Sequence, residues 1–297
     1  MSVLREWSSA WRQFWFAEIP PHSYALLRIL LGGIGIVTIA GAWDSAFWDV
    51  GGIMPPDGAW GLGPWLVAHG LGHAAGAALR LCLLACYACM AAGVATTIAV
   101  PATFLASAGM VWWNWMPFSG AQALHHDLIF CLVFADSGAV WSFDAWRLSS
   151  RNGARPPGTD PVWPLRLIQC QLALVYLSAA LWKLANPEWR SGLALHYAIS
   201  GAIYRRTPWL LPAEFFGGTV LLTYLTLFWE LTFPVLVWTR IRPVVLWCGV
   251  AMHVGMWLTM ELGVFSPTIL AAYVAFLDPW RTHARVTGWR RQWAVAP

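Results

Sequence analysis

Apolar runs of membrane-spanning length, with few charges inside them, constrain the fold of this chain more than any other feature. A spanning helix must cross roughly 30 Å of hydrocarbon, which takes about 17–25 residues. Eight such runs lie approximately at residues 23–43, 74–97, 101–116, 126–141, 164–184, 215–239, 243–260 and 263–277. The third, fourth and eighth runs are short. We therefore predict an all-α, polytopic transmembrane helical bundle of about eight spans, with seven also possible.

The composition excludes an ordinary soluble protein. Hydrophobic residues make up 59% of the 297 residues and charged residues only 11%, against roughly 25% charged in soluble domains. Many of the 23 tryptophans flank the apolar runs, as Trp43, Trp112 and Trp163 do, which is typical of an aromatic belt. The six cysteines all fall in apolar runs, so we expect neither disulfides nor a metal site. The arginines form no basic face, so we expect no nucleic acid partner.

The distribution of charge predicts the orientation in the lipid bilayer, because short cytoplasmic loops are rich in arginine and lysine. Basic residues cluster on one side of the predicted spans: Arg5, Arg12, Arg147, Arg151, Arg155, Arg240, Arg242, Arg281, Arg285, Arg290 and Arg291. The loops at 44–73 and 185–214 then lie outside, although the second carries three arginines and is expected to lie along the interface. We predict a multi-pass membrane protein with both termini cytoplasmic. The first run is expected to stay as a span and not to be cleaved as a signal peptide.

A proline-rich loop at about 147–163 separates the first four runs from the last four. The longest polar connection has about 30 residues, which is below the usual domain minimum of about 50 residues. We therefore predict one transmembrane domain over 1–297, with this loop as a cytoplasmic linker.

Ionisable side chains inside apolar runs cost several kcal/mol to insert, so each is a functional candidate. Five positions qualify: Arg28, Arg80, Lys183, Glu230 and His253. Arg28 and Arg80 lie near the starts of their runs, and we expect both to extend to the headgroups. Glu230 is expected either to pair with an arginine or to face a substrate.

Lys183 is the only lysine, in a chain that otherwise uses 17 arginines as cations. A buried lysine can lose its proton and act as a base, whereas arginine stays charged. We favour a base over a cation that merely reaches the interface. The predicted topology brings further proton-handling residues to the same external side: His125, His126, Asp127, His253 and Glu261. A metal site could use these histidines, but no acidic ligand stands at a typical spacing.

Three segments, in order, resemble the membrane domain of vitamin K-dependent γ-glutamyl carboxylases, known in bacteria as the HTTM (horizontally transferred transmembrane) domain. They are "HHDLIFCLVFADSGAVWSFDAW", "PLRLIQCQLALVYLSAALWKLANPEWRSGLALHYAIS" and "MHVGMWLTMELGVFS". The resemblance runs from about Tyr24 to Trp280.

In that family a membrane-embedded lysine deprotonates vitamin K hydroquinone, which reacts with oxygen to give a base strong enough to drive glutamate carboxylation. The resemblance implies that Lys183 is this lysine, that His126 assists carboxylation and that His253 positions the quinone. We assign quinone binding to four further residues: His125, Asp127, Trp182 and Glu261. The expected cofactor is reduced vitamin K or a menaquinone-type hydroquinone, with O2 and CO2 as co-substrates.

The chain departs from the family pattern at two residues and in length. Trp182 stands where animal enzymes often have a second lysine, and His125 precedes the matched histidine. The sequence also ends soon after the eighth run, whereas the carboxylases continue into a large extracytoplasmic portion that binds the substrate's propeptide. We therefore expect either a small peptide acceptor or quinol oxidation alone. The alternative function is a non-catalytic quinone- or lipid-binding component of a peptide-maturation or toxin system.

Overall fold

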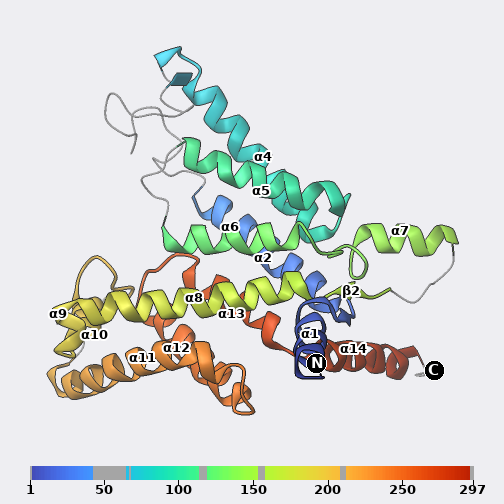
Figure 1. Ribbon diagram of the computed structural model, residues 1–297. Helices are drawn as coiled ribbons and strands as arrows, with labels where there is room; N and C mark the ends of the chain where they lie inside the picture. The colour runs from blue at the N-terminus through green and yellow to red at the C-terminus, as the bar shows by residue number, and fades with distance from the viewer. Residues whose placement is uncertain are drawn as a thin grey trace. The chain divides into compact units, whose positions relative to one another are not determined.

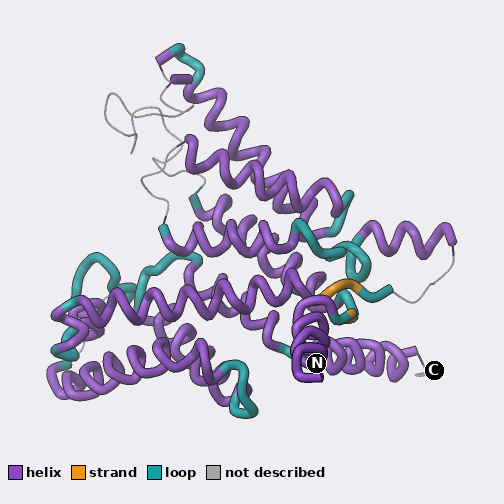
Figure 2. The backbone as a smooth tube through the Cα atoms, viewed as in Figure 1, coloured by secondary structure: helices purple, strands orange, loops and turns teal. Residues whose placement is uncertain are grey.

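The computed structural model describes residues 2–42, 65–66, 68–113, 119–152, 158–207 and 212–294, and these fold almost entirely into helices (Figures 1 and 2). The chain divides into two compact units, Met1–Leu167 with Leu277–Pro297, and Ile168–Phe276. The predicted helical class is confirmed. Trp43, most of the predicted loop 44–73 and part of the predicted linker 147–163 lie outside the described residues.

The first unit contains α1 (Ser2–Phe16), α2 (His22–Gly41), α4 (Gly72–Ala92), α5 (Thr96–Trp113), α6 (Gly120–Leu132), α7 (Phe143–Asn152), the start of α8 (Trp163–Ala185) and α14 (Pro279–Ala294). Two short strands, β1 (Glu18–Ile19) and β2 (Asp160–Pro161), pair antiparallel. The hydroxyl of Tyr24 donates to the Pro161 carbonyl at 2.7 Å, so segments far apart in the sequence are joined at the start of α2.

Helices α2 and α4 pack closely because small residues face each other at their contact. A Cβ atom added at Gly32 would lie 2.8 Å from the Cβ of Ala91, whereas one added at Gly33 would meet nothing within 4 Å. Such contacts matter in membranes, where lipid tails are as apolar as side chains and close packing drives helix association.

Gly32→Ala is expected to lower the stability by roughly 1–3 kcal/mol, because the new methyl group must push α2 away from α4. Gly33→Ala adds the same methyl group in open space and raises helix propensity, so it is expected to be neutral or mildly stabilising. Thermal unfolding of both purified variants in one detergent measures the difference. Equal melting temperatures would contradict the close contact between α2 and α4.

The turn between α4 and α5 corrects the predicted bounds of the second and third spans. The prediction ran one helix from 74 to 97, but α4 ends at Ala92 and α5 already begins at Thr96. Gly93 adopts the left-handed conformation, with φ of 71°, and its N–H bonds the Met90 carbonyl. A glycine in this conformation is a common helix end, and the apolar run continued across it.

Arg28 does not extend to the headgroups as predicted. Its side chain is fully buried in the first unit, and its guanidinium donates to four backbone carbonyls: Met90 at 2.5 Å, Ala91 at 2.7 Å, Ser137 at 3.0 Å and Trp141 at 2.6 Å. Met90 and Ala91 lie in the last turn of α4, whose carbonyls have no helical partner. Arg28 therefore closes the end of α4 and holds the loop after α6.

The fourth predicted span, 126–141, is also misplaced. Helix α6 begins earlier, at Gly120, where Ser119 and Gln122 form a reciprocal capping box, and it ends at Leu132. The chain then turns, because the carbonyls of Ser137 and Trp141 point to the buried guanidinium of Arg28. The apolar residues that follow Leu132 therefore belong to a folded loop.

Asp144, in α7, caps the start of α5 from a distance in sequence. Its carboxylate accepts from the Ala95 N–H at 2.9 Å and from the Thr96 N–H at 2.7 Å. Burial acts to raise the pKa of Asp144, but these hydrogen bonds and the charge of Arg28 outweigh it and lower the pKa below the usual value.

Asp144→Ala is expected to lower the stability by about 1 kcal/mol, the usual cost of losing a helix cap. Because the pKa of Asp144 is lower in the folded protein, its stabilisation is present at neutral pH and is lost as the pH falls below about 4. The melting temperature of Asp144→Ala should therefore approach that of the wild type on acidification. If the two melting temperatures differ by the same amount at neutral pH and at about pH 3.5, Asp144 is not the cap of α5.

The second unit contains most of α8, then α9 (Pro187–Arg190), α10 (Ala194–Ser200), η1 (Ala213–Phe215), α11 (Phe216–Leu236), α12 (Arg242–Thr259), α13 (Phe265–Ala272) and η2 (Tyr273–Phe276). Arg205 and Met260 form an isolated antiparallel bridge. The Glu261 N–H donates to the Tyr204 carbonyl at 2.7 Å, so the segment after α10 is tied to the end of α12.

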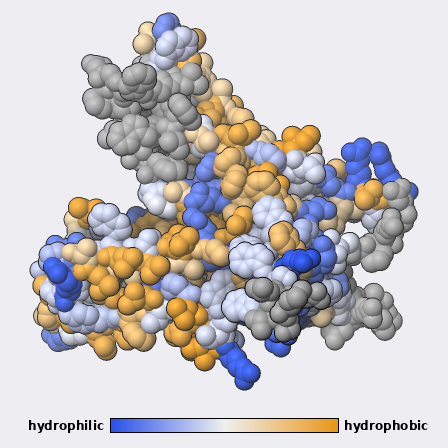
Figure 3. Space-filling model, viewed as in Figure 1, coloured by the Kyte–Doolittle hydropathy of each residue, from blue (hydrophilic) through white to orange (hydrophobic). Residues whose placement is uncertain are grey.

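Four described helices are long and apolar enough to cross a membrane: His22–Gly41, Gly72–Ala92, Trp163–Ala185 and Ala213–Leu236. The segments Thr96–Met110 and Phe265–Phe276 are apolar but shorter. The chain is therefore a membrane protein, but the predicted count of about eight spans is not confirmed. Large hydrophobic side chains such as Leu221, Phe228 and Val235 on α11 are exposed, as expected for a lipid-facing surface. Hydrophobic residues also form much of the surface seen in Figure 3.

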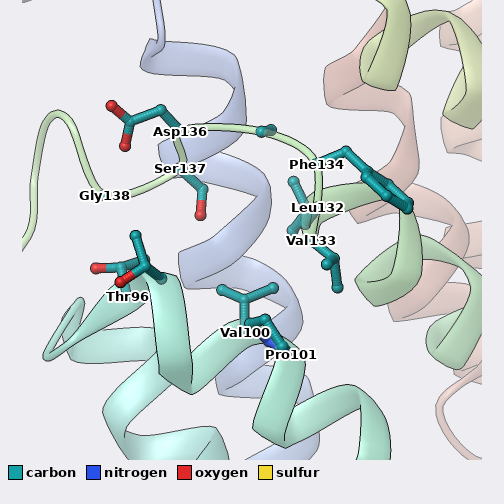
Figure 4. Close-up of a pocket in the computed structure, with 11 residues that line it drawn as sticks. Thr96, Val100, Pro101, Leu132, Val133, Phe134, Asp136, Ser137 and Gly138 are labelled. Atoms are coloured by element: carbon teal, nitrogen blue, oxygen red, sulfur yellow. The ribbon is translucent and has the colours of Figure 1, made fainter.

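A cavity of about 290 Å³ lies in the first unit between the first half of α5 and the loop after α6 (Figure 4). Its apolar lining includes Val100, Pro101 and Leu132, and its polar lining includes Thr96 and Ser137. The Ser137 carbonyl accepts from Arg28, so the wall of this cavity is part of the structure that Arg28 holds.

Candidate active site

Lys183 forms an ion pair with Glu230 in the second unit. Lys183 lies in the last turn of α8, and Glu230 lies in the second half of α11. The Lys183 amine contacts Oε1 of Glu230, whose side chain is only 7% exposed against 22% for Lys183. Glu230 was expected to pair with an arginine or to face a substrate. Its partner in the structure is the lysine.

The end of α8 explains how the chain places Lys183. Asn186 ends α8 and caps α9, because its side chain accepts from the Glu188 N–H at 2.8 Å and Pro187 starts the next helix. The short helix carries Trp189 back towards Lys183, so that the amine lies 4.7 Å from the centre of the indole ring. Lys183 therefore has a carboxylate on one side and an aromatic face on another.

One carboxylate oxygen of Glu230 remains available. Oε1 contacts Lys183, but Oε2 is buried and has no hydrogen-bond partner among the described residues. Nearly all buried polar groups bond to protein, water or ligand. Glu230 Oε2 is therefore an acceptor that a third group with an N–H or O–H can satisfy.

His253 belongs to a second polar group in the same unit. It lies on α12, is 1% exposed, and its Nε2 is 2.8 Å from the Tyr176 hydroxyl. The Tyr176 hydroxyl is in turn 2.7 Å from the Tyr273 hydroxyl. The other ring nitrogen of His253, Nδ1, is buried and has no hydrogen-bond partner in the described part of the chain.

The two polar groups are neighbours along α8. Tyr176 precedes Lys183 by two helical turns, which places both on one face of α8 about 10 Å apart along the axis. The Tyr176 ring packs against Trp229 and Phe233 on α11, with ring centres 4.7 Å and 4.5 Å away, and these residues flank Glu230. The Lys183–Glu230 ion pair and Tyr176, the α8 member of the hydrogen-bonded chain, therefore both lie where α8 meets α11.

The remaining predicted histidines lie in the first unit, on α6. His126 Nδ1 is 2.8 Å from the Ser107 hydroxyl, and its ring stacks on Phe104. His125 is buried, and its Nε2 donates to the Leu31 carbonyl at 3.0 Å. Asp127 follows on the same helix and is half-buried. His125 therefore ties α6 to α2.

Trp182 and Glu261, which we predicted to bind the quinone, are both exposed. Trp182 is 78% exposed on α8 beside Lys183 in the sequence. Glu261 is exposed and forms a two-pronged pair with Arg206, with distances of 2.9 Å and 3.2 Å. In the described parts of the chain, no group of three or more His, Cys, Asp or Glu side chains is arranged to hold a metal ion.

The model of the HTTM domain family matches residues 16–280, which is most of the chain. The chain belongs to the HTTM domain family. At family level this agrees with the resemblance to the membrane domain of vitamin K-dependent carboxylases. No curated protein and no solved structure matches the chain.

Sequence reasoning missed the two tyrosines of this HTTM domain. Tyr176 and Tyr273 are both buried, their hydroxyls bond each other, and the Tyr176 hydroxyl also bonds His253. The sequence does carry one signal for Tyr176, because it stands about two turns before Lys183 in an apolar helix. No comparable signal exists for Tyr273, whose place depends on the packing of η2 against the unit's other helices.

Proposed function

We propose that this HTTM protein activates a hydroquinone, with Lys183 as the base that accepts the proton of a phenolic hydroxyl group. The observation that carries the proposal is the pairing of the chain's only lysine with a buried carboxylate. The proposed substrate is reduced vitamin K or a menaquinone-type hydroquinone. The proposed setting is the bacterial inner membrane, with both termini cytoplasmic and this site towards the external side.

Glu230 solves the main difficulty of a lysine base, which must be neutral before it can accept a proton. A charged ammonium–carboxylate pair and a neutral amine–acid pair contain the same number of protons. In an apolar site the charged pair loses much of its advantage, because both ions are desolvated. Glu230 can therefore take the lysine's own proton without releasing it to the lipid.

The surroundings of Glu230 and His253 fit a hydroquinone. Glu230 Oε2 and His253 Nδ1 are buried polar atoms without partners in the described residues, and a hydroquinone carries two polar oxygens on one flat apolar ring. The rings of Trp229 and Phe233 on α11 beside Glu230, together with Phe265 at 5.7 Å from His253, make the surroundings of these atoms apolar, as for a hydrophobic ligand. Glu230, His253 and Lys183 would hold its two oxygens.

The bound hydroquinone would supply four electrons to O2, two in its oxidation to the quinone level and two from the ring double bond that becomes the epoxide, so that one oxygen atom enters the epoxide and the other leaves as water. In this scheme Lys183 holds the proton taken from the first hydroxyl, and His253 bonds the second oxygen. His126 is proposed to assist the carboxylation half-reaction. In that half-reaction the strong base formed from the hydroquinone and oxygen takes a γ-proton from a glutamate of a small peptide, and CO2 adds to the resulting carbanion. Trp182 and Glu261, in the same unit as Lys183, are proposed as further contacts of the quinone or of the substrate.

Oxygen uptake by the purified protein in lipid nanodiscs tests this proposal. Addition of reduced vitamin K or menaquinol is expected to give uptake well above that of empty nanodiscs. Uptake equal to that of empty nanodiscs would overturn the proposal. If hydroquinone binds without oxygen uptake, the favoured function becomes the alternative, a non-catalytic quinone-binding component of a peptide-maturation system. The ion pair between Lys183 and Glu230 is the observation that favours this alternative, because a proton that stays on Lys183 permits binding without reaction.

A further inference from the structure

The chain of hydroxyl groups beside His253 constrains where the imidazole proton lies. Tyr273, Tyr176 and His253 contribute two hydroxyl protons and, for a neutral ring, one ring proton. The chain contains two hydrogen bonds, Tyr273 to Tyr176 at 2.7 Å and Tyr176 to Nε2 of His253 at 2.8 Å. The protons can run along it in either of two directions.

If the protons run towards His253, both hydroxyls are satisfied. Tyr273 then donates to Tyr176, Tyr176 donates to the bare Nε2, and the ring proton lies on Nδ1. In this arrangement Nδ1–H is the one donor of the chain without a partner in the described residues.

If the protons run the other way, two groups lose partners. Nε2–H then donates to Tyr176, Tyr176 donates to Tyr273, and the Tyr273 proton has no acceptor in the described part of the chain. The bare Nδ1 is unsatisfied as well. Each buried polar group without a partner costs roughly 1–3 kcal/mol, so the first direction is favoured.

We infer that Tyr273 and Tyr176 are positioning residues that hold His253 in the Nδ1–H tautomer, so that His253 acts as a hydrogen-bond donor to a ligand oxygen and not as a base. This inference rests on the proposed function for the identity of the ligand. It assigns complementary roles within one unit: Glu230 in the ion pair is an ionised carboxylate, so its Oε2 can only accept a hydrogen bond, whereas His253 Nδ1–H donates one. The ligand therefore presents a hydroxyl group towards Glu230 and Lys183, and a second oxygen that accepts a hydrogen bond towards His253.

Nitrogen NMR of histidine-labelled protein in micelles tests the tautomer without any hydroquinone. The chain has eight histidines, so the His253 signals are identified as those missing from His253→Gln. The expected result is a protonated Nδ1 and an unprotonated Nε2. A protonated Nε2 in the wild type would overturn the inference, whatever the outcome of the oxidation assay.

Two matched variants separate a positioning role from a merely structural one. Tyr176→Phe removes the donor to Nε2, so a mixture of both tautomers is expected. Tyr273→Phe leaves that donor in place, so the Nδ1–H form is expected to persist. If Tyr176→Phe also keeps a pure Nδ1–H form, the inference is wrong. Should Tyr176→Phe fail to fold, the wild-type and Tyr273→Phe spectra still decide the tautomer.

The oxidation assay supplies a second readout that depends on the proposed function. Tyr176→Phe is expected to lower kcat about 10-fold with little change in KM, because outer partners of a functional histidine act by fixing its tautomer and orientation. Tyr273→Phe is expected to have a smaller effect. Equal losses in both variants, with an unchanged tautomer, would overturn the positioning role. A wild type that gives the Nδ1–H spectrum but no oxidation would refute the proposed function alone.

Discussion

Lys183→Arg is expected to lower hydroquinone oxidation by about 10²–10⁴-fold, the range that a general base contributes. Arginine keeps the positive charge and can still pair with Glu230, but it does not lose its proton under any working condition. The loss would therefore come from the missing base and not from a broken ion pair. Initial rates of oxygen uptake in nanodiscs measure the effect.

Lys183→Arg is more informative than Lys183→Ala. The alanine variant leaves Glu230 buried without its partner, which typically costs about 3–5 kcal/mol and confuses lost activity with lost structure. Arg281→Lys, at an exposed pair with Asp278 on α14, provides a matched control that should keep full activity. A Lys183→Arg variant as active as this control would rule out Lys183 as the base.

Arg28→Leu is expected to have the largest effect on stability, a loss of about 3–5 kcal/mol. It leaves the carbonyls of Met90, Ala91, Ser137 and Trp141 without their donor in a buried place. Arg28→Lys keeps the charge but replaces a five-donor fork by a compact ammonium, so an intermediate loss is expected. Thermal unfolding in one detergent measures the three stabilities, which are expected to fall from the wild type to Arg28→Lys and then to Arg28→Leu.

The control for Arg28 is Arg281→Leu. Arg281 has an 82% exposed side chain with one weak pair, so its loss should change the stability by less than about 0.5 kcal/mol. If Arg28→Leu had the same melting temperature as Arg281→Leu, the four carbonyls would have to find other partners, and Arg28 would not be the residue that closes α4.

The sequence was sufficient for features that depend on composition. Apolar runs predicted helices of membrane-spanning length, and the described residues contain four helices long and apolar enough to cross a membrane. The lone lysine among 17 arginines pointed to Lys183, which the structure pairs with a buried carboxylate. The family resemblance found from three segments is confirmed at family level by the match to the HTTM domain.

Features that depend on contacts between distant segments were not predictable. The residues around Arg28 in the sequence are the same whether its side chain is buried or reaches the headgroups. The difference comes from four distant carbonyls that accept its hydrogen bonds, those of Met90, Ala91, Ser137 and Trp141. For Glu230, one of the two alternatives named an arginine as the partner, where the structure has Lys183, because hydropathy does not reveal which face of α11 meets α8. Local signals were also overlooked, since Gly93 and the Ser119 capping box mark helix ends inside apolar sequence.

Mass spectrometry of the quinone recovered after reaction under ¹⁸O2 tests the central claim most directly. Purified wild-type protein in nanodiscs is incubated with reduced vitamin K, next to Lys183→Arg. If Lys183 activates the hydroquinone, the wild type yields an epoxide carrying one ¹⁸O atom and Lys183→Arg does not. Unlabelled quinone alone from the wild type, or the same labelled epoxide from Lys183→Arg, would contradict the claim.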